Sequence, residues 1–319
     1  MDQNQSKRSL TDLVILFLKG IGMGAADVVP GVSGGTIAFI TNIYEELIHS
    51  INSVVTAVRQ DFIKFNFKQF FRQINFPFLI PLVAGIGTSV LLLSRIVLHL
   101  LTEHPVAIWS FFFGLIVASA VVVYRRIRSH SIIVFLAACA GILIAYGITI
   151  FSPAQTPESW WFILLSGFIA ICAMILPGIS GSFILLLLGK YEFILNAVRE
   201  LKFSVILLFI IGCIGGLAVF SSVLDWLLRK YHDLAVAVLA GFMIGSLNKV
   251  WPWKKTIEFF TDSHGNNKPL IEENVMPETY RTITGLEPTL GLAIALGFLG
   301  FTIVILLETF SSKNTFKSL

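Results

Sequence analysis

Charged residues are scarce in this chain. Asp, Glu, Lys and Arg make up only 13% of its 319 residues, whereas hydrophobic residues make up 55% and the mean hydropathy is +0.83. A soluble domain of this length cannot bury so much apolar surface in one core, so the composition excludes a soluble globular protein. We therefore expect an all-α integral membrane protein that crosses the bilayer several times.

Cysteine is also rare, and the motifs of several site classes are missing. The three cysteines, Cys139, Cys172 and Cys213, lie within apolar runs, which excludes a disulfide framework and offers no metal-ligand spacing. Neither GxGxxG nor the P-loop pattern occurs, so no nucleotide-binding loop is expected. The pI near 9.0 comes from basic residues in short loops, which favours contact with membrane phospholipids and not with nucleic acid. We expect no cofactor and no metal site.

What the sequence does contain is two similar halves. Each half begins with a broken apolar segment and continues with three apolar runs of about the 20 residues that a spanning helix needs. The first half covers 13–151, with a hairpin at 13–58 and spans near 76–100, 106–124 and 131–151. The second covers 160–308, with a hairpin at 160–198 and spans near 203–228, 234–250 and 288–307. The remaining pieces are tails at 1–12 and 309–319 and a long loop at 251–287.

The two hairpins match in register. Residues 19–51 aligned on 166–198 give nine identities in 33 positions, including both residues of the pairs Tyr44-Glu45 and Tyr191-Glu192. A hairpin returns to its own side and three spans follow, so the second half is inserted upside down relative to the first. The sequence therefore predicts two inverted-topology repeats, each a broken or re-entrant helical hairpin followed by three transmembrane helices. Whether the hairpin legs stop midway or cross is left open.

The basic residues give an orientation. Most of them fall on one side: the N-terminus, the segment 59–72, "YRRIRSH", the pair Arg229-Lys230 and the C-terminus. The other side has fewer, mostly mixed with acidic residues in the loop 251–287. The positive-inside rule therefore predicts a multi-pass protein of the cytoplasmic membrane with both termini cytoplasmic and the long loop outside.

Each hairpin is interrupted at Pro-Gly-x-Ser-Gly. Proline ends a helix, a serine can cap the next one, and the free N–H groups of that helix favour an anion. Because irregular backbone at membrane depth needs polar partners, we expect the two breaks to meet and form a phosphate or carboxylate site. The alternative is a pair of proline kinks with glycines for close packing. The helix-breaking residues are Pro30, Gly31, Pro177 and Gly178, and the anion-binding residues are Ser33, Gly34, Gly35, Thr36, Ser180, Gly181 and Ser182.

The two segments "GMGAADVVPGVSGGTIAFITNIYEELI" and "ILPGISGSFILLLLGKYEFIL" carry a resemblance. They are similar to the PopT-type polyprenyl-phosphate (undecaprenyl-phosphate) transporter family, and the resemblance extends over essentially the whole chain. It implies a flippase that returns undecaprenyl phosphate from the outer to the inner leaflet of the bacterial cytoplasmic membrane, for recycling of the lipid carrier in envelope synthesis. The missing nucleotide motif favours coupling to an ion, either a proton or sodium. The oligomeric state is not indicated.

Other polar residues have two interpretations each. Asp27 precedes the first break and either binds the coupling ion or caps the broken loop. Glu45 and Glu192 lie about 18 Å along a helix from the capping serines, so each is a coupling or gating group or, with its neighbouring tyrosine, an interfacial anchor. Arg95 contacts the phosphate or extends to the headgroups, and Lys190 has the same two possibilities, with the headgroups favoured.

Two other functions fit the same features. One is an ion-coupled transporter of a small soluble anion, which a cavity closed to lipid would favour. The other is an intramembrane enzyme acting on lipid phosphate. The sequence offers no His nucleophile, Asp partner and Arg clamp near the breaks, and no Ser/His pair, so we do not expect an enzyme.

Overall fold

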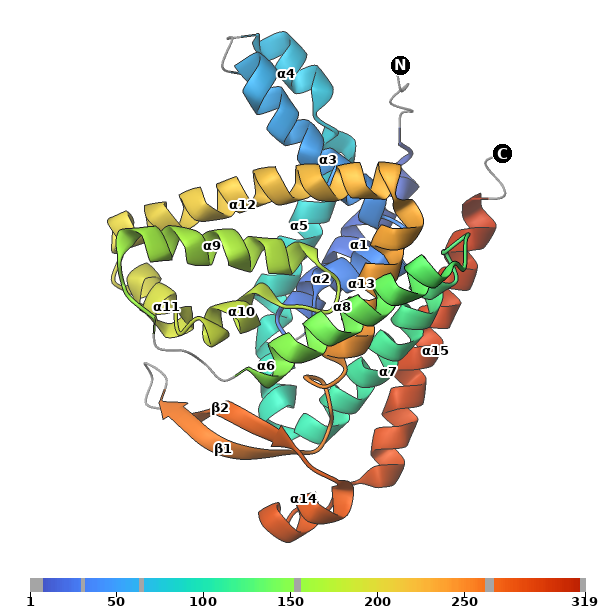
Figure 1. Ribbon diagram of the computed structural model, residues 1–319, viewed down its shortest axis with the longest axis vertical. Helices are drawn as coiled ribbons and strands as arrows, with labels where there is room; N and C mark the ends of the chain where they lie inside the picture. The colour runs from blue at the N-terminus through green and yellow to red at the C-terminus, as the bar shows by residue number, and fades with distance from the viewer. Residues whose placement is uncertain (1–7, 30–31, 63–65, 152–155, 262–266, 316–319) are drawn as a thin grey trace.

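The computed structural model describes residues 8–29, 32–62, 66–151, 156–261 and 267–315, and most of them are helical (Figure 1). The first half contains α1 (Leu10–Asp27), α2 (Gly34–Ile40), α3 (Tyr44–Ala57), the π-helical turn η1 (Val58–Phe62), α4 (Phe67–Gln73), α5 (Phe76–Leu92), α6 (Ser94–Glu103), α7 (Pro105–Tyr124) and α8 (Ile132–Ile150). The second half contains α9 (Trp160–Ile175), α10 (Gly181–Leu187), α11 (Tyr191–Arg199), α12 (Phe203–Lys230), α13 (His232–Ser246), β1 (Lys254–Thr261), β2 (Asn267–Asn274), α14 (Pro277–Thr284) and α15 (Leu290–Thr315).

Local sequence sets several helix starts. Ser9 and Asp12 form a capping box at the start of α1. Pro105 begins α7, where the missing N–H of proline removes no helical hydrogen bond. Ser131 caps α8 by accepting a hydrogen bond from the Val134 N–H at 3.3 Å.

Several helices have the length and composition of membrane spans. Among the described residues, α7, α8, α12 and α15 are each long and apolar enough to cross a bilayer. The pair α10–α11, bent by 110°, passes the same test as one broken span or re-entrant loop. Helices α5, α9 and α13 are apolar but shorter. The chain is therefore a mainly helical, multi-pass membrane protein, in agreement with the predicted class.

The first predicted span differs from the structure. The run 76–100 was expected to form one helix, but α5 ends at Leu92 and α6 begins at Ser94. The polar residues Ser94, Arg95 and His99 all lie in α6, so the polar end of the predicted run forms a separate helix.

Four helix pairs build the body of the protein. Helix α1 packs on α5 and α9 on α12, while α7 packs on α15 and α8 on α13. Glycines allow these close crossings: a Cβ added to Gly20 would lie 2.3 Å from a backbone oxygen of α5, and one added to Gly167 would lie 2.4 Å from a backbone oxygen of α12. A Cβ added to Gly114 would lie 1.9 Å from a backbone oxygen of α15, and one added to Gly241 would lie 2.3 Å from a backbone oxygen of α8. Matching glycines of the two halves thus sit at matching crossings.

The long loop predicted at 251–287 contains regular structure that the sequence did not lead us to expect. Strands β1 and β2 pair antiparallel, with an irregularity between Thr256 and Phe259, and α14 follows them. Trp253, Tyr280 and Val106 pack together, which fixes this segment to the beginning of α7. The hairpin and α14 therefore cover one end of the helical body (Figure 1).

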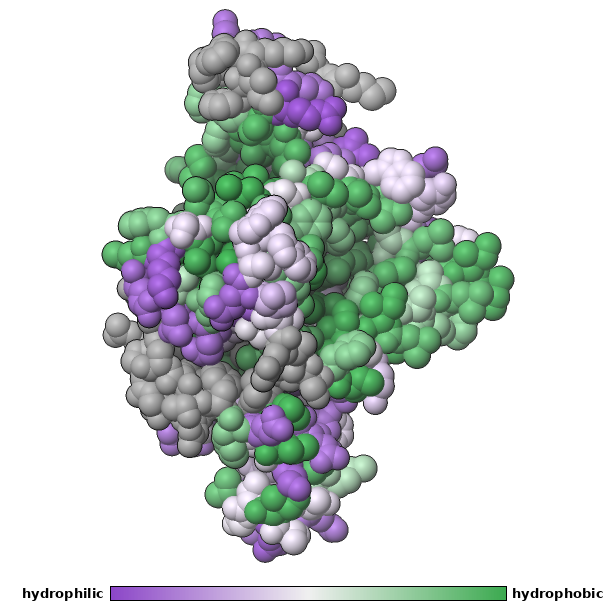
Figure 2. All heavy atoms as spheres, turned by 60° about the vertical axis from the view of Figure 1, so that its left-hand side comes forward, coloured by the Kyte–Doolittle hydropathy of each residue, from purple (hydrophilic) through white to green (hydrophobic). Residues whose placement is uncertain are grey.

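The two ends of the molecule differ in what they carry. The start of α1, the end of α15 and helix α4 lie at the upper end in Figure 1, and the β hairpin and α14 lie at the lower end. Figure 2 shows hydrophobic side chains over much of the middle of one face, with hydrophilic side chains near both ends and in a further group at mid-height on the left of the view. Exposed apolar residues on the long helices, such as Leu143 of α8 and Ile214 of α12, suit contact with lipid tails.

Candidate functional site

The first break separates α1 from α2. Helix α1 ends at Asp27, and Ser33 is extended, with φ −124° and ψ 136°. The Asp27 carboxylate accepts a hydrogen bond from the Gly34 N–H at 2.7 Å, and Ser33 Oγ accepts one from the Gly35 N–H at 3.0 Å. Both bonds satisfy free N–H groups of the first turn of α2. Pro30 and Gly31, the predicted breaking residues, lie outside the described residues.

The second break separates α9 from α10. Pro177 and Gly178 follow the end of α9, and both are buried. Gly178 has a positive φ of +88°, and a Cβ there would lie 2.9 Å from the Ser246 hydroxyl, so the turn requires glycine. The hydroxyls of Ser180 and Ser182 lie 2.7 Å apart and share a hydrogen bond.

The two breaks contact each other. Three hydrogen bonds each join a side chain of the first half to the backbone of the second: Ser33 Oγ to the Met174 carbonyl (3.2 Å), the Gly178 N–H to Thr36 Oγ1 (3.0 Å), and the Tyr44 hydroxyl to the Ile175 carbonyl (3.2 Å). Gly35 also lies against this backbone, since a Cβ on it would be 2.6 Å from the Ile175 carbonyl oxygen. The described part of the first Pro-Gly-x-Ser-Gly segment and the second segment, 147 positions apart in sequence, are therefore neighbours in space.

The two breaks differ in how their polar groups are used. At the first, Ser33, Gly34, Gly35 and Thr36 are all buried, and Asp27 supplies the negative charge at the start of α2. At the second, the position of Asp27 is taken by Met174, and Ser180 forms no side-chain cap with any described residue. Gly181 and Ser182 are partly exposed. The second break therefore has no carboxylate at this position, and its residues Gly181 and Ser182 are accessible.

Two lysines lie near the far ends of the short helices. Lys19 donates to the carbonyl of Thr41, the residue that follows α2, at 2.7 Å. Lys190 follows α10 and donates to the Thr156 carbonyl at 2.7 Å, with its ammonium group over the rings of Phe162 and Phe193. Lys190 is only 2% exposed, so the prediction that it extends to the headgroups is wrong. A cation suits the negative end of a helix dipole.

Tyr44 belongs to this site, although the sequence predicted a different position for it. A straight helix from Ser33 would carry Tyr44 to the headgroups, and the sequence therefore favours an interfacial anchor. In the structure α2 ends at Ile40 and Asn42 adopts a positive φ of 59°, which turns the chain back. Tyr44 is therefore 1% exposed and bonded to the second break, and the anchor prediction is wrong for it. The sequence signal that could have pointed to this role is the match of Tyr44 with Tyr191 in the repeat.

For the other predicted residues, Glu45, Glu192 and Arg95, the structure gives no contact with either break among the described side chains. Glu45 is 61% exposed and lies 3.2 Å from the His232 ring at the start of α13. Glu192 is in the first turn of α11, beyond the far end of α10. Arg95 belongs to α6, and its side chain is outside the described residues.

Comparisons with known proteins identify the relatives of this chain. The sequence model of the family described as undecaprenyl phosphate translocase-like matches residues 23–268. A protein of Vibrio cholerae named polyprenyl-phosphate transporter is 45% identical over 297 residues, which are 93% of this chain and 96% of that protein. A Staphylococcus aureus protein of the same name is 31% identical over 256 residues, 75% of this chain and 86% of that protein. No solved structure matches the chain. Residues 23–48 and 175–195, which contain both breaks, fall within the family match. The chain belongs to the undecaprenyl phosphate translocase-like family.

Proposed function

We propose that this protein is a flippase that carries undecaprenyl phosphate from the outer to the inner leaflet of the cytoplasmic membrane. Family membership and the similarity to two proteins named polyprenyl-phosphate transporter support the substrate. The observation that carries the proposal is the direct bonding of the two breaks, because it gathers backbone and hydroxyl groups of both halves inside an apolar helical body. Such polar groups suit a phosphate whose prenyl tail stays in lipid.

An inverted repeat is part of this proposal. The pair α1–α5 of the first half corresponds in sequence to α9–α12 of the second, and α7–α15 corresponds to α13–α8. Matching elements thus contact one another in matching pairs, as a pseudo-two-fold axis between the halves requires. Both termini would be cytoplasmic, because helix α4, which carries Lys68 and Arg72, lies at the same end as the start of α1 and the end of α15 (Figure 1).

The phosphate would bind first at the second break. Ser180, Gly181 and Ser182 provide hydroxyl and N–H donors there, and no carboxylate of the described chain competes for them. At the first break Asp27 holds the Gly34 N–H, so this site opens to a phosphate only when the carboxylate is released. Binding of a proton or a sodium ion to Asp27 would favour that release and would couple the ion gradient to transport.

Transport in proteoliposomes tests the proposal. A fluorescent undecaprenyl phosphate is placed in the outer leaflet, and a membrane-impermeant phosphatase is added outside. The fraction of the lipid that this phosphatase can no longer hydrolyse is followed over time. We expect the wild type to protect the lipid and the double variant Ser180→Ala/Ser182→Ala to lose most of the rate. Ser53→Ala is the matched control, because that hydroxyl donates to the Ser50 carbonyl of its own helix.

Two outcomes would reject the proposal. Equal rates for the wild type and the double variant would remove the second break from the path. Release of inorganic phosphate by the wild type, without the added phosphatase, would replace the flippase with an intramembrane enzyme.

A further inference from the structure

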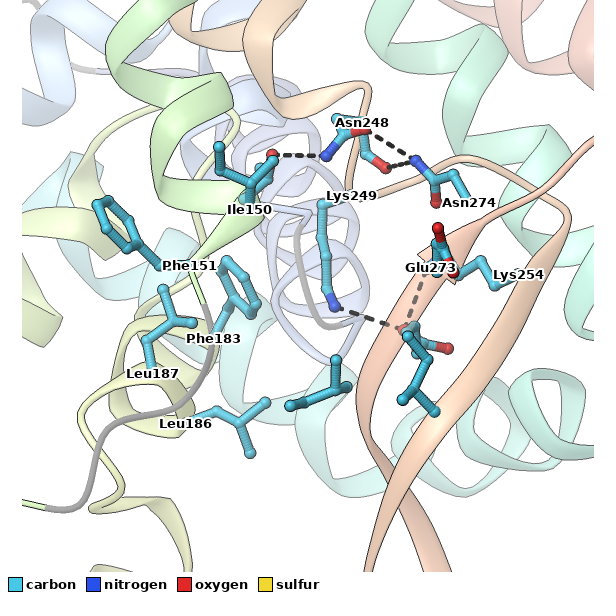
Figure 3. Close-up of a pocket in the computed structure, with 14 residues that line it drawn as sticks. Ile150, Phe151, Phe183, Leu186, Leu187, Asn248, Lys249, Lys254, Glu273 and Asn274 are labelled. Atoms are coloured by element: carbon cyan, nitrogen blue, oxygen red, sulfur yellow. Dashed lines mark hydrogen bonds and ion pairs between the residues drawn. The ribbon is translucent and has the colours of Figure 1, made fainter.

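A cavity of about 360 Å³ lies between the β hairpin and the helix that follows the second break. One wall is mainly apolar and comes from the end of α8 and from α10. The other comes from the hairpin and the residues after α13, and it carries the charged side chains together with Ile257 and Ile271. Figure 3 shows Lys249 extending between these walls, with Phe151, Phe183 and Leu187 on one side and the hairpin on the other. Its volume is near the lower end of the range of about 300–1,000 Å³ for ligand sites.

Two lysines in this cavity share one carboxylate oxygen. The ammonium groups of Lys249 and Lys254 both lie 3.4 Å from Glu272 Oε2. These distances are long for charge-assisted hydrogen bonds, which measure about 2.7–2.9 Å. The three side chains are 17%, 6% and 18% exposed, so the charges are largely removed from water. Glu273, the other acidic residue of the lining, is exposed.

The lysines have more donors than the described chain satisfies. Each ammonium group has three N–H bonds. Apart from Glu272, the described partners are aromatic faces: Lys254 lies 3.9 Å from the centre of the Trp109 ring, and Lys249 lies 4.7 Å from that of Phe183. These contacts hold both ammonium groups in place without using their hydrogen-bonding capacity. A tetrahedral oxyanion between the lysines would accept several of these bonds.

The apolar wall suggests that this anion carries a hydrocarbon chain. Ile150 and Phe151 at the end of α8 are 59% and 68% exposed, which in a membrane protein indicates contact with lipid. Leu186 and Leu187 continue the wall along α10. Leu186 is six residues beyond Ser180, which corresponds to about 9 Å along a helix. The cavity thus adjoins the helix that leads to the second break.

We propose that this cavity binds the phosphate monoester headgroup of a polyprenyl lipid between Lys249 and Lys254, in place of Glu272, before the lipid reaches the second break. The first isoprene units lie against the apolar wall, and the rest of the tail leaves past Ile150 and Phe151 into lipid. The identity of the lipid rests on the proposed function, whereas the phosphate site rests on the two lysines. Glu272 acts as an internal anion that holds the site in the absence of lipid.

Equilibrium binding to the full-length protein in nanodiscs tests the site. The probe is a fluorescent undecaprenyl phosphate, and the competitors are undecaprenol, inorganic phosphate and phosphatidylglycerol. We expect Lys249→Gln and Lys254→Gln each to weaken binding about tenfold, the effect of losing one charge-assisted hydrogen bond. Glu272→Gln should strengthen binding, because it removes the competing charge. Lys255→Gln, which removes an exposed lysine of the same strand, is the matched control and should bind as the wild type does.

The competitors and a parallel transport assay separate the possible failures. Competition by inorganic phosphate as strong as that by the lipid would overturn the assignment to a lipid headgroup. If the wild type transports lipid while the Lys249 and Lys254 variants bind it as the Lys255 variant does, the cavity site is wrong and the proposed function stands. If those variants lose binding but the wild type does not transport, the site stands and the proposed function fails. Misfolding can only weaken binding, so the stronger binding expected for Glu272→Gln cannot result from a misfolded protein.

Discussion

Thr36 Oγ1 accepts a hydrogen bond from the Gly178 N–H at 3.0 Å, across 142 residues of sequence. Thr36 lies in the first turn of α2, and Gly178 is the left-handed residue of the second break. The two proline-containing segments are therefore fixed to each other and not only to their own halves.

Thr36→Val should destabilise the protein, because it keeps the shape of the side chain but leaves a buried N–H without its acceptor. Such a group costs about 1–3 kcal/mol. We expect a lower thermal midpoint in detergent and slower lipid transport. Thr88→Val is the control, since the exposed Thr88 hydroxyl donates to a carbonyl of its own helix. Equal midpoints for the two variants would show that the Thr36 contact does not stabilise the site.

Gly35→Ala should separate the two breaks, because its Cβ would lie 2.6 Å from the Ile175 carbonyl oxygen. Backbone cannot move as a flexible side chain does, and overpacking of this kind costs about 1–3 kcal/mol. Thermal unfolding followed by intrinsic fluorescence measures the effect.

The control for that substitution is Gly87→Ala in α5, where an added Cβ meets nothing within 4 Å. Alanine has the higher helix propensity, by up to about 1 kcal/mol, so this variant should be as stable as the wild type or more so. Stability of Gly35→Ala equal to that of Gly87→Ala would mean that the breaks are not tightly packed.

The sequence predicted the contact between the two breaks better than it predicted the chain around them. Proline, glycine and serine in one short pattern determine where a helix stops and the next begins, and this information is local. The duplication then indicated that the breaks belong together, and the bonds of Ser33 and Thr36 to the second break agree with that. What the pattern did not reveal is which partners satisfy these groups, because backbone carbonyls such as that of Met174 have no signature in sequence.

Two misjudged residues share a physical cause. Tyr44 and Lys190 were placed by assuming straight helices, yet α2 and α10 each have seven residues and are followed by a turn. A turn at membrane depth brings the following residues back into the protein, so both side chains are buried. The β hairpin was missed for another reason: two short strands separated from the apolar runs leave a weak alternation that composition does not distinguish from a loop.

Asp27→Asn tests the coupling that we propose for the first break. Asparagine keeps an oxygen that can accept from the Gly34 N–H, so the fold should be retained, but it removes the charge that binds a proton or a sodium ion. We expect transport to continue without dependence on either ion gradient, as measured in proteoliposomes with imposed gradients.

Asp12→Asn provides the comparison, because Asp12 lies at the exposed first turn of the same helix. It should leave the response to the gradients unchanged. A gradient response in Asp27→Asn equal to that of the wild type would assign Asp27 to capping alone.

The pH dependence of lipid binding should report the state of Lys254. Burial lowers the pKa of its ammonium group from the ordinary value of 10.5 to about 8, against the opposing effect of Glu272 and with the added effect of Lys249. These two are the charged groups that face it, from β2 and from the segment after α13. Lys254 is therefore charged at pH 7 and largely neutral at pH 9, so the affinity of the wild type for undecaprenyl phosphate should fall over this interval.

Lys254→Gln separates this effect from titration of the ligand, whose phosphate completes its ionisation near pH 6 and so gains little charge above pH 7. The variant should bind more weakly at pH 7 but show almost no further loss by pH 9.

The lowered pKa of Lys254 also has a consequence for stability. Between about pH 8 and pH 10.5 the unfolded chain binds more protons at this lysine than the folded protein does. The free energy of unfolding should therefore rise with pH in the wild type relative to Lys254→Gln. Parallel affinity curves for the two proteins from pH 7 to pH 9 would mean that the lysine ammonium does not contact the phosphate.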